Sequence, residues 1–402
     1  MTIRLYYQDA YLTEFDAQVL RSIPGDKGSS GVILDRTCFY PTSGGQPCDH
    51  GFLQSQPVFD VQEQDGDIVH WISGRLQDIS VHGRIDWPRR FDHMQQHTGQ
   101  HILSQAFLKM FDAQTVGFHL GAEFSTIDVA HATLEDHKAE AIEHLANEIV
   151  LSDREIFTRI VGPEQLEGLD LRKMPTIDQG IRIVEVEGFD QTPCGGTHCA
   201  RTGEVGPIAI RKWEHRSGET RVEFLCGWRA LRDYHWKTAA INQLALTFSV
   251  KDTDLPEAVV RLREESAANR RELMRLRDEY LNVEAERLLA QAAVWEGMRV
   301  VVHAHHDREP QEIRRLASLL TQSPRTVALL GVGGERARLV FARSEDVEVD
   351  VSALLKATCR AFGGSGGGQA GMAQGGGFAG DRLEDALHTA HELLVAEQGM
   401  KA

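Results

Sequence analysis

The sequence predicts an α+β protein with a small N-terminal β-barrel, a second α/β domain, a helical coiled-coil linker and a C-terminal α/β domain with a glycine-rich loop. Three observations support this. The 402 residues exceed the roughly 250 to 300 at which a single core stops growing. The hydrophobic period changes along the chain from strand-like to helical, and histidine and cysteine occur together in two short motifs. We therefore expect four parts, at residues 1–90, 91–250, 251–296 and 297–402.

The N-terminal barrel is predicted from short apolar stretches at 32–34 and 68–72, which alternate with Gly, Pro and Asp turn signals through about residue 90. From Phe91 to about Val150 the apolar period becomes helical, so a helical layer joins the strands there. At 255–283 apolar residues step by four and three, the seam of a coiled coil or a long helical hairpin, which Ser266 and Asn269 weaken. Many Arg and Glu residues flank this seam, as is typical of a solvent-exposed helix. The segment could therefore serve as a spacer or as a dimerisation arm.

The C-terminal domain is predicted from buried strands at 299–303 and 326–332 around a helix at 310–320, with a last helix at 381–397. Before that helix, residues 363–380 read GGSGGGQAGMAQGGGFAG, a composition typical of a flexible linker. The Gln and Met residues within the tract argue against a mere spacer.

Composition narrows the class of protein. With 42% hydrophobic and 25% charged residues, the chain is unlike a fibre, a mucin or a disordered protein. No apolar stretch approaches the roughly 18 residues of a membrane span, and the N-terminus has no signal-peptide pattern, so we expect a cytoplasmic protein with no membrane partner. Six scattered cysteines favour metal binding or burial as thiols over disulfides. The formal net charge of −16 disfavours non-specific binding to nucleic acid, so any such contact must be local.

A metal site is predicted by two motifs. His97 and His101 are four residues apart and would share one helix face, and Cys194 and His198 flank a tight Gly-Gly turn. One thiolate and three imidazoles suit tetrahedral Zn²⁺. The helix lacks the Glu of H-E-x-x-H peptidases, which disfavours a zinc peptidase. Because closed four-ligand sites are usually structural, hydrolytic zinc here would require one labile ligand, His198 or Cys194.

These motifs resemble a known family. HTGQH at 97–101 followed by CGGTH at 194–198 is similar to the editing domain of alanyl-tRNA synthetases and of their stand-alone AlaX-type relatives. RTCFYPTSGGQPCDHG at 36–51 resembles the family's glycine-rich barrel motif, and RTGEVGPI at 201–208 extends the match. The tract at 363–380 resembles the DHH-associated domain of the long AlaX subclass, so the resemblance covers nearly the whole chain.

The resemblance implies a zinc-binding editing domain at 91–250 and a DHH-associated domain at 297–402. It implies a hydrolase that removes serine or glycine from mischarged alanine tRNA in trans, with the glycine-rich tract contacting the outer corner of the tRNA. No class II aminoacylation domain precedes the barrel motif, so we expect no amino-acid activation and no ATP chemistry. Arg211, Lys212 and Arg216 are candidates for local tRNA contacts.

Among the candidate catalytic residues, Thr37 matches a family threonine whose hydroxyl is thought to help accept serine, although a β-branched strand residue is an equal interpretation. Gln46, Thr98 and His119 are expected to support the site from outside the metal ligands, or to be structural hydrogen-bonders. Gly44 and Gly45 fit either a tight turn or a close approach to ligand.

Two other functions compete with editing. One is a non-catalytic tRNA-binding protein with structural zinc. The other is a DHH-type phosphoesterase, prompted by His305, His306 and Asp307; since the order is H-H-D and not D-H-H, these residues are expected to form a loop after a strand. Either the coiled segment or the C-terminal domain would join two copies of the chain if the protein is a homodimer.

Overall fold

The computed structural model describes residues 1–130, 133–174 and 180–399, which divide into two compact units, Met1–Thr247 and Phe248–Ala402. Both units combine helices with sheets, so the predicted α+β class is confirmed. The unit boundary lies close to the predicted break after residue 250, whereas the finer division into four domains stays a prediction. None of the helices in the described part of the chain is long and apolar enough to cross a membrane.

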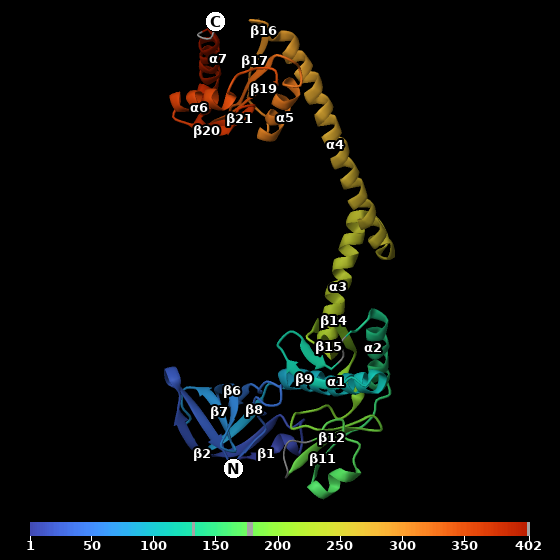
Figure 1. Ribbon diagram of the computed structural model, residues 1–402. Coiled ribbons are helices and arrows are strands. Elements are labelled where there is room, and N and C mark those ends of the chain that lie inside the picture. The colour runs from blue at the N-terminus through green and yellow to red at the C-terminus, as the bar shows by residue number, and fades with distance from the viewer. Residues whose placement is uncertain (131–132, 175–179, 400–402) are drawn as a thin grey trace. The chain divides into compact units, whose positions relative to one another are not determined.

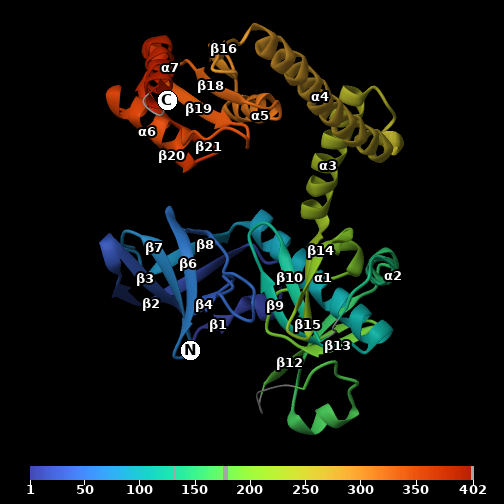
Figure 2. The same cartoon turned by 45° about the horizontal axis from the view of Figure 1, so that its top comes forward.

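The first part of unit 1 is a closed six-stranded barrel in which strand follows strand in the order β2-β3-β7-β6-β5-β8 (Figure 2). Its strands are β2 (Glu14–Pro24), β3 (Ser29–Leu34), β5 (Gly51–Leu53), β6 (Gln56–Gln64), β7 (Asp67–Ser73) and β8 (Ser80–Ile85). Side chains of β8 alternate strictly between exposed and buried, as expected where one face of a strand meets a core. Beside the barrel, β1 (Ile3–Arg4) pairs in parallel with β4 (Arg36–Thr37).

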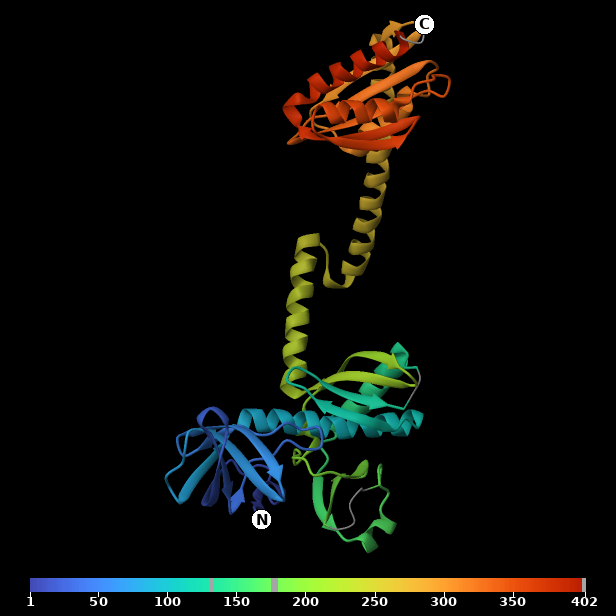
Figure 3. The ribbon, with the colours of Figure 1, turned by 60° about the vertical axis from the view of Figure 1, so that its left-hand side comes forward.

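The rest of unit 1 is built around the long helix α1 (Trp87–Phe111), whose N-terminus is capped by Asp86. In Figure 3 a four-stranded sheet lies on one side of α1 and a three-stranded sheet on the other. The first sheet contains β9 (Thr115–Leu120), β10 (Ser125–Val129), β14 (Ile208–Arg216) and β15 (Glu219–Cys226), and the second contains β11 (Ile156–Val161), β12 (Ile181–Val186) and β13 (Asp190–Pro193). Two further helices are α2 (Asp136–Leu151) and α3 (Gly227–Phe248).

The central position of α1 explains its unusual burial. Fifteen of its residues are buried, and nine of these are polar or charged, six of them within residues 95–101 in the middle of the helix. A helix that is covered all round must satisfy its polar side chains within the protein, because water does not reach them. The middle of α1 is therefore suited to hold a buried polar site.

Unit 2 is a six-stranded mixed sheet in the order β16-β17-β18-β19-β21-β20, with helices on both faces (Figure 1). The strands are β16 (Ala293–Trp295), β17 (Met298–His305), β18 (Thr326–Val332), β19 (Arg336–Arg343), β20 (Ser365–Gln369) and β21 (Met372–Ala379), and the helices are α4 (Leu255–Gln291), α5 (Pro310–Leu320), α6 (Val351–Ala361) and α7 (Leu383–Gly399). The C-terminal end of α4 packs with α5 on one face, and α6 and α7 pack on the other.

Several predictions for unit 2 can be compared with these elements. The predicted helix at 310–320 and strand at 326–332 coincide with α5 and β18. His305 ends β17, while His306 and Asp307 follow it, as expected for a loop after a strand. The predicted glycine-rich loop is wrong, because most of 363–380 forms the antiparallel hairpin β20–β21. The predicted seam at 255–283 lies within the single helix α4 and is largely exposed, so coiled-coil pairing stays a prediction.

Candidate metal centre

The structure brings together the four predicted metal ligands. His97 and His101 lie on α1, and Cys194 and His198 lie in the segment that follows β13. One ligand atom from each of the four residues lies within 4.8 Å of the others. The Cys194 Sγ is 3.4 Å from His97 Nε2 and 3.3 Å from His198 Nε2. We call these four residues the Cys/His cluster.

The segment 194–198 approaches α1 closely because of its glycines. A Cβ at Gly196 would lie 2.2 Å from Cε1 of His97, which no side chain tolerates. Arg182 of β12 also binds this segment, because its Nη1 donates to the backbone oxygens of Cys194 and Gly196, both at 2.9 Å. Backbone contacts therefore place the thiol before any metal binds.

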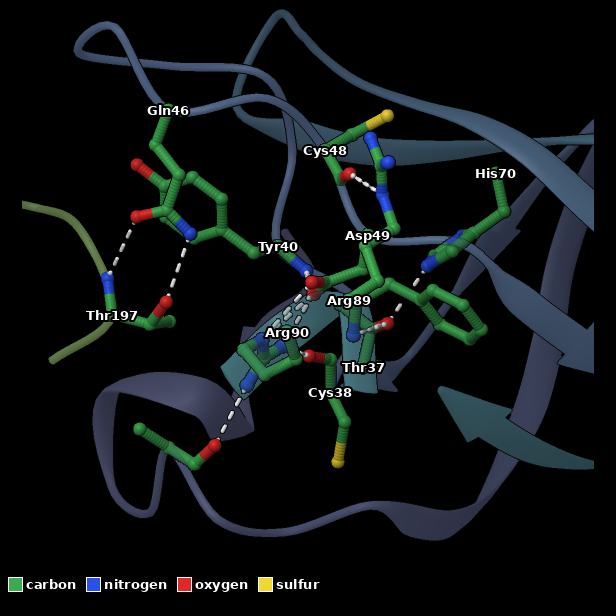
Figure 4. A network of polar contacts seen from close by, with 12 residues as sticks. Thr37, Cys38, Tyr40, Gln46, Cys48, Asp49, His70, Arg89, Arg90 and Thr197 are labelled. Carbon is green, nitrogen blue, oxygen red and sulfur yellow. Dashed lines mark hydrogen bonds and ion pairs between the residues drawn. The ribbon is translucent and has the colours of Figure 1, made fainter. Parts of the chain in front are cut away.

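The orientation of His97 is set by Gln46. Nδ1 of His97 lies 2.8 Å from Gln46 Oε1, and the amide orientation is fixed because Oε1 also accepts from the Thr197 N–H at 3.2 Å while Nε2 donates to the Thr197 hydroxyl at 2.8 Å (Figure 4). Since Oε1 only accepts, Nδ1 must carry the proton. Nε2 of His97 therefore presents its lone pair to the Cys/His cluster, as a metal requires.

The other two histidines have partners of their own. Nδ1 of His198 lies 3.3 Å from the hydroxyl oxygen of Thr98, which also accepts from the Cys199 N–H. Nδ1 of His101 lies 3.4 Å from a carboxylate oxygen of Asp190, itself paired with Arg172 at 2.8 Å. Each imidazole thus has an amide, hydroxyl or carboxylate beside its second nitrogen, the arrangement usual around metal-binding histidines.

Electrostatics favour the ligand forms of Cys194 and His198. Burial alone would raise the pKa of the Cys194 thiol, but the neighbouring His97 and His198 and the hydrogen bonds from the histidines bring it well below its ordinary value. Burial lowers the pKa of His198 to about 3. The pKa of His101 is raised, because its contacts with Asp190 and Cys194 outweigh the opposing effect of burial. A thiolate among imidazoles is a donor set that fits a divalent metal ion.

The Cys/His cluster lies at one side of a cavity of about 390 Å³. The cavity is lined by His97, His101 and Cys194 from the cluster, by Thr115 to Phe118 of β9, by Gly44 of the barrel motif and by Arg172 and Lys173. The ring of Phe118 stacks on His97 with centroids 5.2 Å apart. A small ligand in this cavity would therefore meet the cluster, an aromatic face and positive charge at once.

The barrel motif at 36–51 is fixed to α1 by a buried ion pair. The guanidinium of Arg90 and the carboxylate of Asp49 are fully buried and lie 3.0 Å apart at their Nε and Oδ1 atoms (Figure 4). Arg90 also donates to the backbone oxygen of Cys38, and Asp49 accepts from the Tyr40 N–H at 2.6 Å. Because Arg90 and His97 are two turns apart on α1, this pair sets the distance between the barrel motif and the cluster.

The remaining predicted site residues differ in their placement. Thr37 is fully buried in the barrel, where its hydroxyl lies 2.7 Å from His70 Nε2 and accepts from the Phe39 N–H at 3.0 Å. Since His70 Nδ1 is 2.9 Å from the Val32 oxygen and must donate there, the Thr37 hydroxyl donates to Nε2. The structure does not place Thr37 in the cavity lining. His119 is exposed on β9, and it is not among the residues that line the cavity.

Sequence reasoning missed Asp190, Arg172, Arg182 and Phe118. The segment 182–190 precedes Cys194 closely, and an acidic residue near metal-ligand motifs is a weak signal for Asp190 alone. Arg172 and Phe118 carry no motif, and only their position beside the cluster identifies them.

Comparisons with known proteins point to one family. The family model "Threonyl and Alanyl tRNA synthetase second additional domain" matches residues 181–223, the "DHHA1 domain" matches 297–396, and "tRNA synthetases class II (A)" matches 10–89, the barrel region. The Alanyl-tRNA editing protein AlaX-L of Pyrococcus horikoshii is 32% identical over 401 residues, which cover 93% of this chain and 94% of that protein.

The chain is also 32% identical over 392 residues to an alanine–tRNA ligase of Pyrococcus abyssi, of which it covers 42%, so it spans less than half the length of that relative. A solved structure of the C-Ala domain from Aquifex aeolicus alanyl-tRNA synthetase matches 25% of this chain at 27% identity and a TM-score of 0.24. The near-complete match to AlaX-L defines the class of protein. This chain belongs to the family of alanyl-tRNA editing proteins of the AlaX-L type.

Proposed function

We propose that this protein is a trans-editing deacylase, which hydrolyses the ester that joins serine or glycine to the terminal adenosine of alanine tRNA, with Zn²⁺ held by the Cys/His cluster. The observation that carries the proposal is the buried cluster beside an open cavity. Membership of the AlaX-L family supports the substrate class. Three imidazoles and one thiolate support zinc as the ion.

A zinc ion bound here would act as a Lewis acid on the ester, or orient the substrate amine or ribose. The protein's own residues define where the ester lies. Gln46 keeps the proton of His97 on Nδ1, and Thr98 and Asp190 lie beside Nδ1 of His198 and of His101. Phe118 offers a ring face at the cavity wall, and Lys173 supplies positive charge for the phosphate of the terminal nucleotide.

Unit 2 would supply affinity for the body of the tRNA. A cavity of about 370 Å³ is lined by Arg314 and by Gly367, Gly368 and Gln369 of the hairpin β20–β21. Glycine backbone can come close to a phosphate, and a guanidinium binds it strongly. The acidic net charge of the chain makes such local contacts more important, and the affinity for tRNA should fall with rising salt concentration.

The test is to mix the metal-loaded protein with alanine tRNA charged separately with serine, glycine and alanine, and to measure amino-acid release. We expect loss of serine or glycine with alanine spared. His101→Ala should abolish release while circular dichroism and tRNA binding stay normal, and the exposed His144→Ala is the matched control. Hydrolysis that survives complete removal of zinc would contradict the zinc-dependent mechanism.

A second candidate is a non-catalytic tRNA-binding protein, which the closed set of four protein ligands favours because such sites are usually structural. In that case no amino acid is released from any charged tRNA although zinc is bound. His101→Ala would then unfold unit 1 and weaken tRNA binding together.

A further inference from the structure

A second group of metal-ligand side chains lies in unit 2. Glu284 of α4 and His303 and His305 of β17 place one ligand atom each within 4.8 Å of one another. The two imidazole rings are 4.5 Å apart at their centroids, and Nδ1 of His305 is 3.9 Å from Oε1 of Glu284. We call these three residues the Glu/His cluster.

The backbone explains why these side chains meet. His303 and His305 are two residues apart on a strand and so point to the same face of the sheet. Val301 of that face packs with Leu281, Ala285 and Leu288 on the last turns of α4. Glu284 lies in the same helical segment, so the packing of α4 on the sheet carries its carboxylate to the two histidines.

Burial leaves polar atoms of the cluster without partners. His305 and Glu284 are more than nine-tenths buried, and Nε2 of His305 has no hydrogen-bond partner in the structure. One carboxylate oxygen of Glu284, Oε2, accepts from Arg308 at 2.8 Å. The other, Oε1, faces the imidazoles. A buried imidazole with an unused nitrogen reduces stability unless something completes its coordination.

We propose that the Glu/His cluster is a second metal site, which binds a divalent transition ion such as Zn²⁺ through two imidazoles and one carboxylate oxygen. Two histidines and a glutamate are an established zinc donor set and leave a coordination position for water. The ion would tie the C-terminal end of α4 to β17. Arg308 competes for Glu284, so this site binds its ion more weakly than the Cys/His cluster does.

The experiment uses full-length, untagged protein that is stripped with a chelator and then titrated with Co²⁺ and Zn²⁺. We expect two ions per chain, one for each cluster. Only the Cys/His cluster contains a thiolate, so only one of the two Co²⁺ ions should give a sulfur-to-metal charge-transfer band. Cys194→Ala should remove that band and leave the other ion bound.

His305→Ala should lower the stoichiometry to one ion per chain and keep the charge-transfer band. His303→Gln, at a half-buried position that should tolerate the change, is the second variant if His305→Ala perturbs the fold. His306→Ala is the matched control, because His306 is exposed and adjacent but outside the Glu/His cluster. A single ion bound by the wild type, or two ions bound by both cluster variants, would overturn the proposal, whatever the outcome of the deacylation assay.

Discussion

Each histidine of the Cys/His cluster has a polar group beside its second ring nitrogen, and this group differs from one histidine to the next. The amide of Gln46 is the best defined of the three partners, because Thr197 fixes both of its polar atoms. The role of Gln46 is therefore to position His97, and the outcome of removing it can be separated from a loss of fold.

We expect Gln46→Ala to weaken zinc binding by about 10- to 100-fold, because His97 loses the acceptor that fixes its tautomer and orientation. Competition with a chromophoric chelator measures this affinity. Gln62→Ala, an exposed glutamine of the barrel, should leave the affinity unchanged. Equal zinc affinity in Gln46→Ala and wild type would show that His97 is oriented without this contact.

The buried His70 predicts how the stability of the barrel depends on pH. Burial lowers the pKa of His70 to about 4, so the folded barrel resists its protonation, whereas the unfolded chain takes up this proton near the ordinary value of 6.5. Stability is therefore full above pH 6.5 and is lost as the pH falls from 6.5 to 4. The contribution of His70 amounts to about 2 to 3 kcal/mol between pH 7.5 and 4.5.

Urea unfolding at these two pH values measures the effect. His70→Gln should lose about 2 to 3 kcal/mol less than the wild type on acidification, since Gln does not titrate. The comparison cancels the contributions of other groups, including His93, whose pKa burial also lowers to about 4. Identical pH profiles for the two proteins would mean that His70 is not the responsible group.

For single residues, the sequence predicted proximity better than it predicted the role of each side chain. Spacing within each short motif was enough to group His97 with His101 and Cys194 with His198, because a helix turn and a glycine turn constrain each pair locally. The placement of Thr37 depends on His70, thirty-three residues away, and that of Asp190 on the packing of β13 against α1. Such contacts arise only from the tertiary fold and leave no local pattern.

Among the elements, the hairpin β20–β21 shows why a composition can mislead. Glycine has a low intrinsic preference for strands, so 363–380 resembles a linker in sequence. In the structure Gly366 and Gly375 are paired across the hairpin, and α6 packs over them. Glycine is required here because it lets the hairpin backbone approach α6 closely. Strand propensities of single residues do not include this tertiary contact. The helix α5 and the strand β18, by contrast, follow directly from their apolar periods.

We expect Gly375→Ala to destabilise unit 2 by about 1 to 3 kcal/mol through overpacking. A Cβ at Gly375 would lie 2.8 Å from each of three atoms: Sγ of Cys359, Cα of Gly366 and the backbone oxygen of Ser365. Gly371→Ala is the control, because no atom lies within 4 Å of a Cβ built at this position in the turn of the same hairpin. Denaturant unfolding of the two full-length variants compares them, and equal stability would contradict the close-packing argument.

For the molecule as a whole, the exposed apolar residues of α4 bear on whether two chains associate. The predicted seam of α4 exposes apolar side chains at regular spacing: Val259, Leu262, Leu273, Leu276, Tyr280 and Val283. An apolar stripe of this length on one helix is usually covered by another helix, and a repeat of four and three residues is the pattern of a coiled coil. We therefore expect a homodimer through α4.

The double substitution Leu273→Glu and Leu276→Glu should convert the dimer to a monomer, because it places charges in the apolar seam while Glu preserves helix propensity. Sedimentation equilibrium of the full chain over a range of concentrations measures the mass. Met274→Glu is the matched control, since Met274 is an equally apolar, exposed residue of α4 that lies off the seam. A wild type that stays monomeric at all concentrations, or a control that dissociates as readily as the seam variant, would show that this stripe does not join two chains.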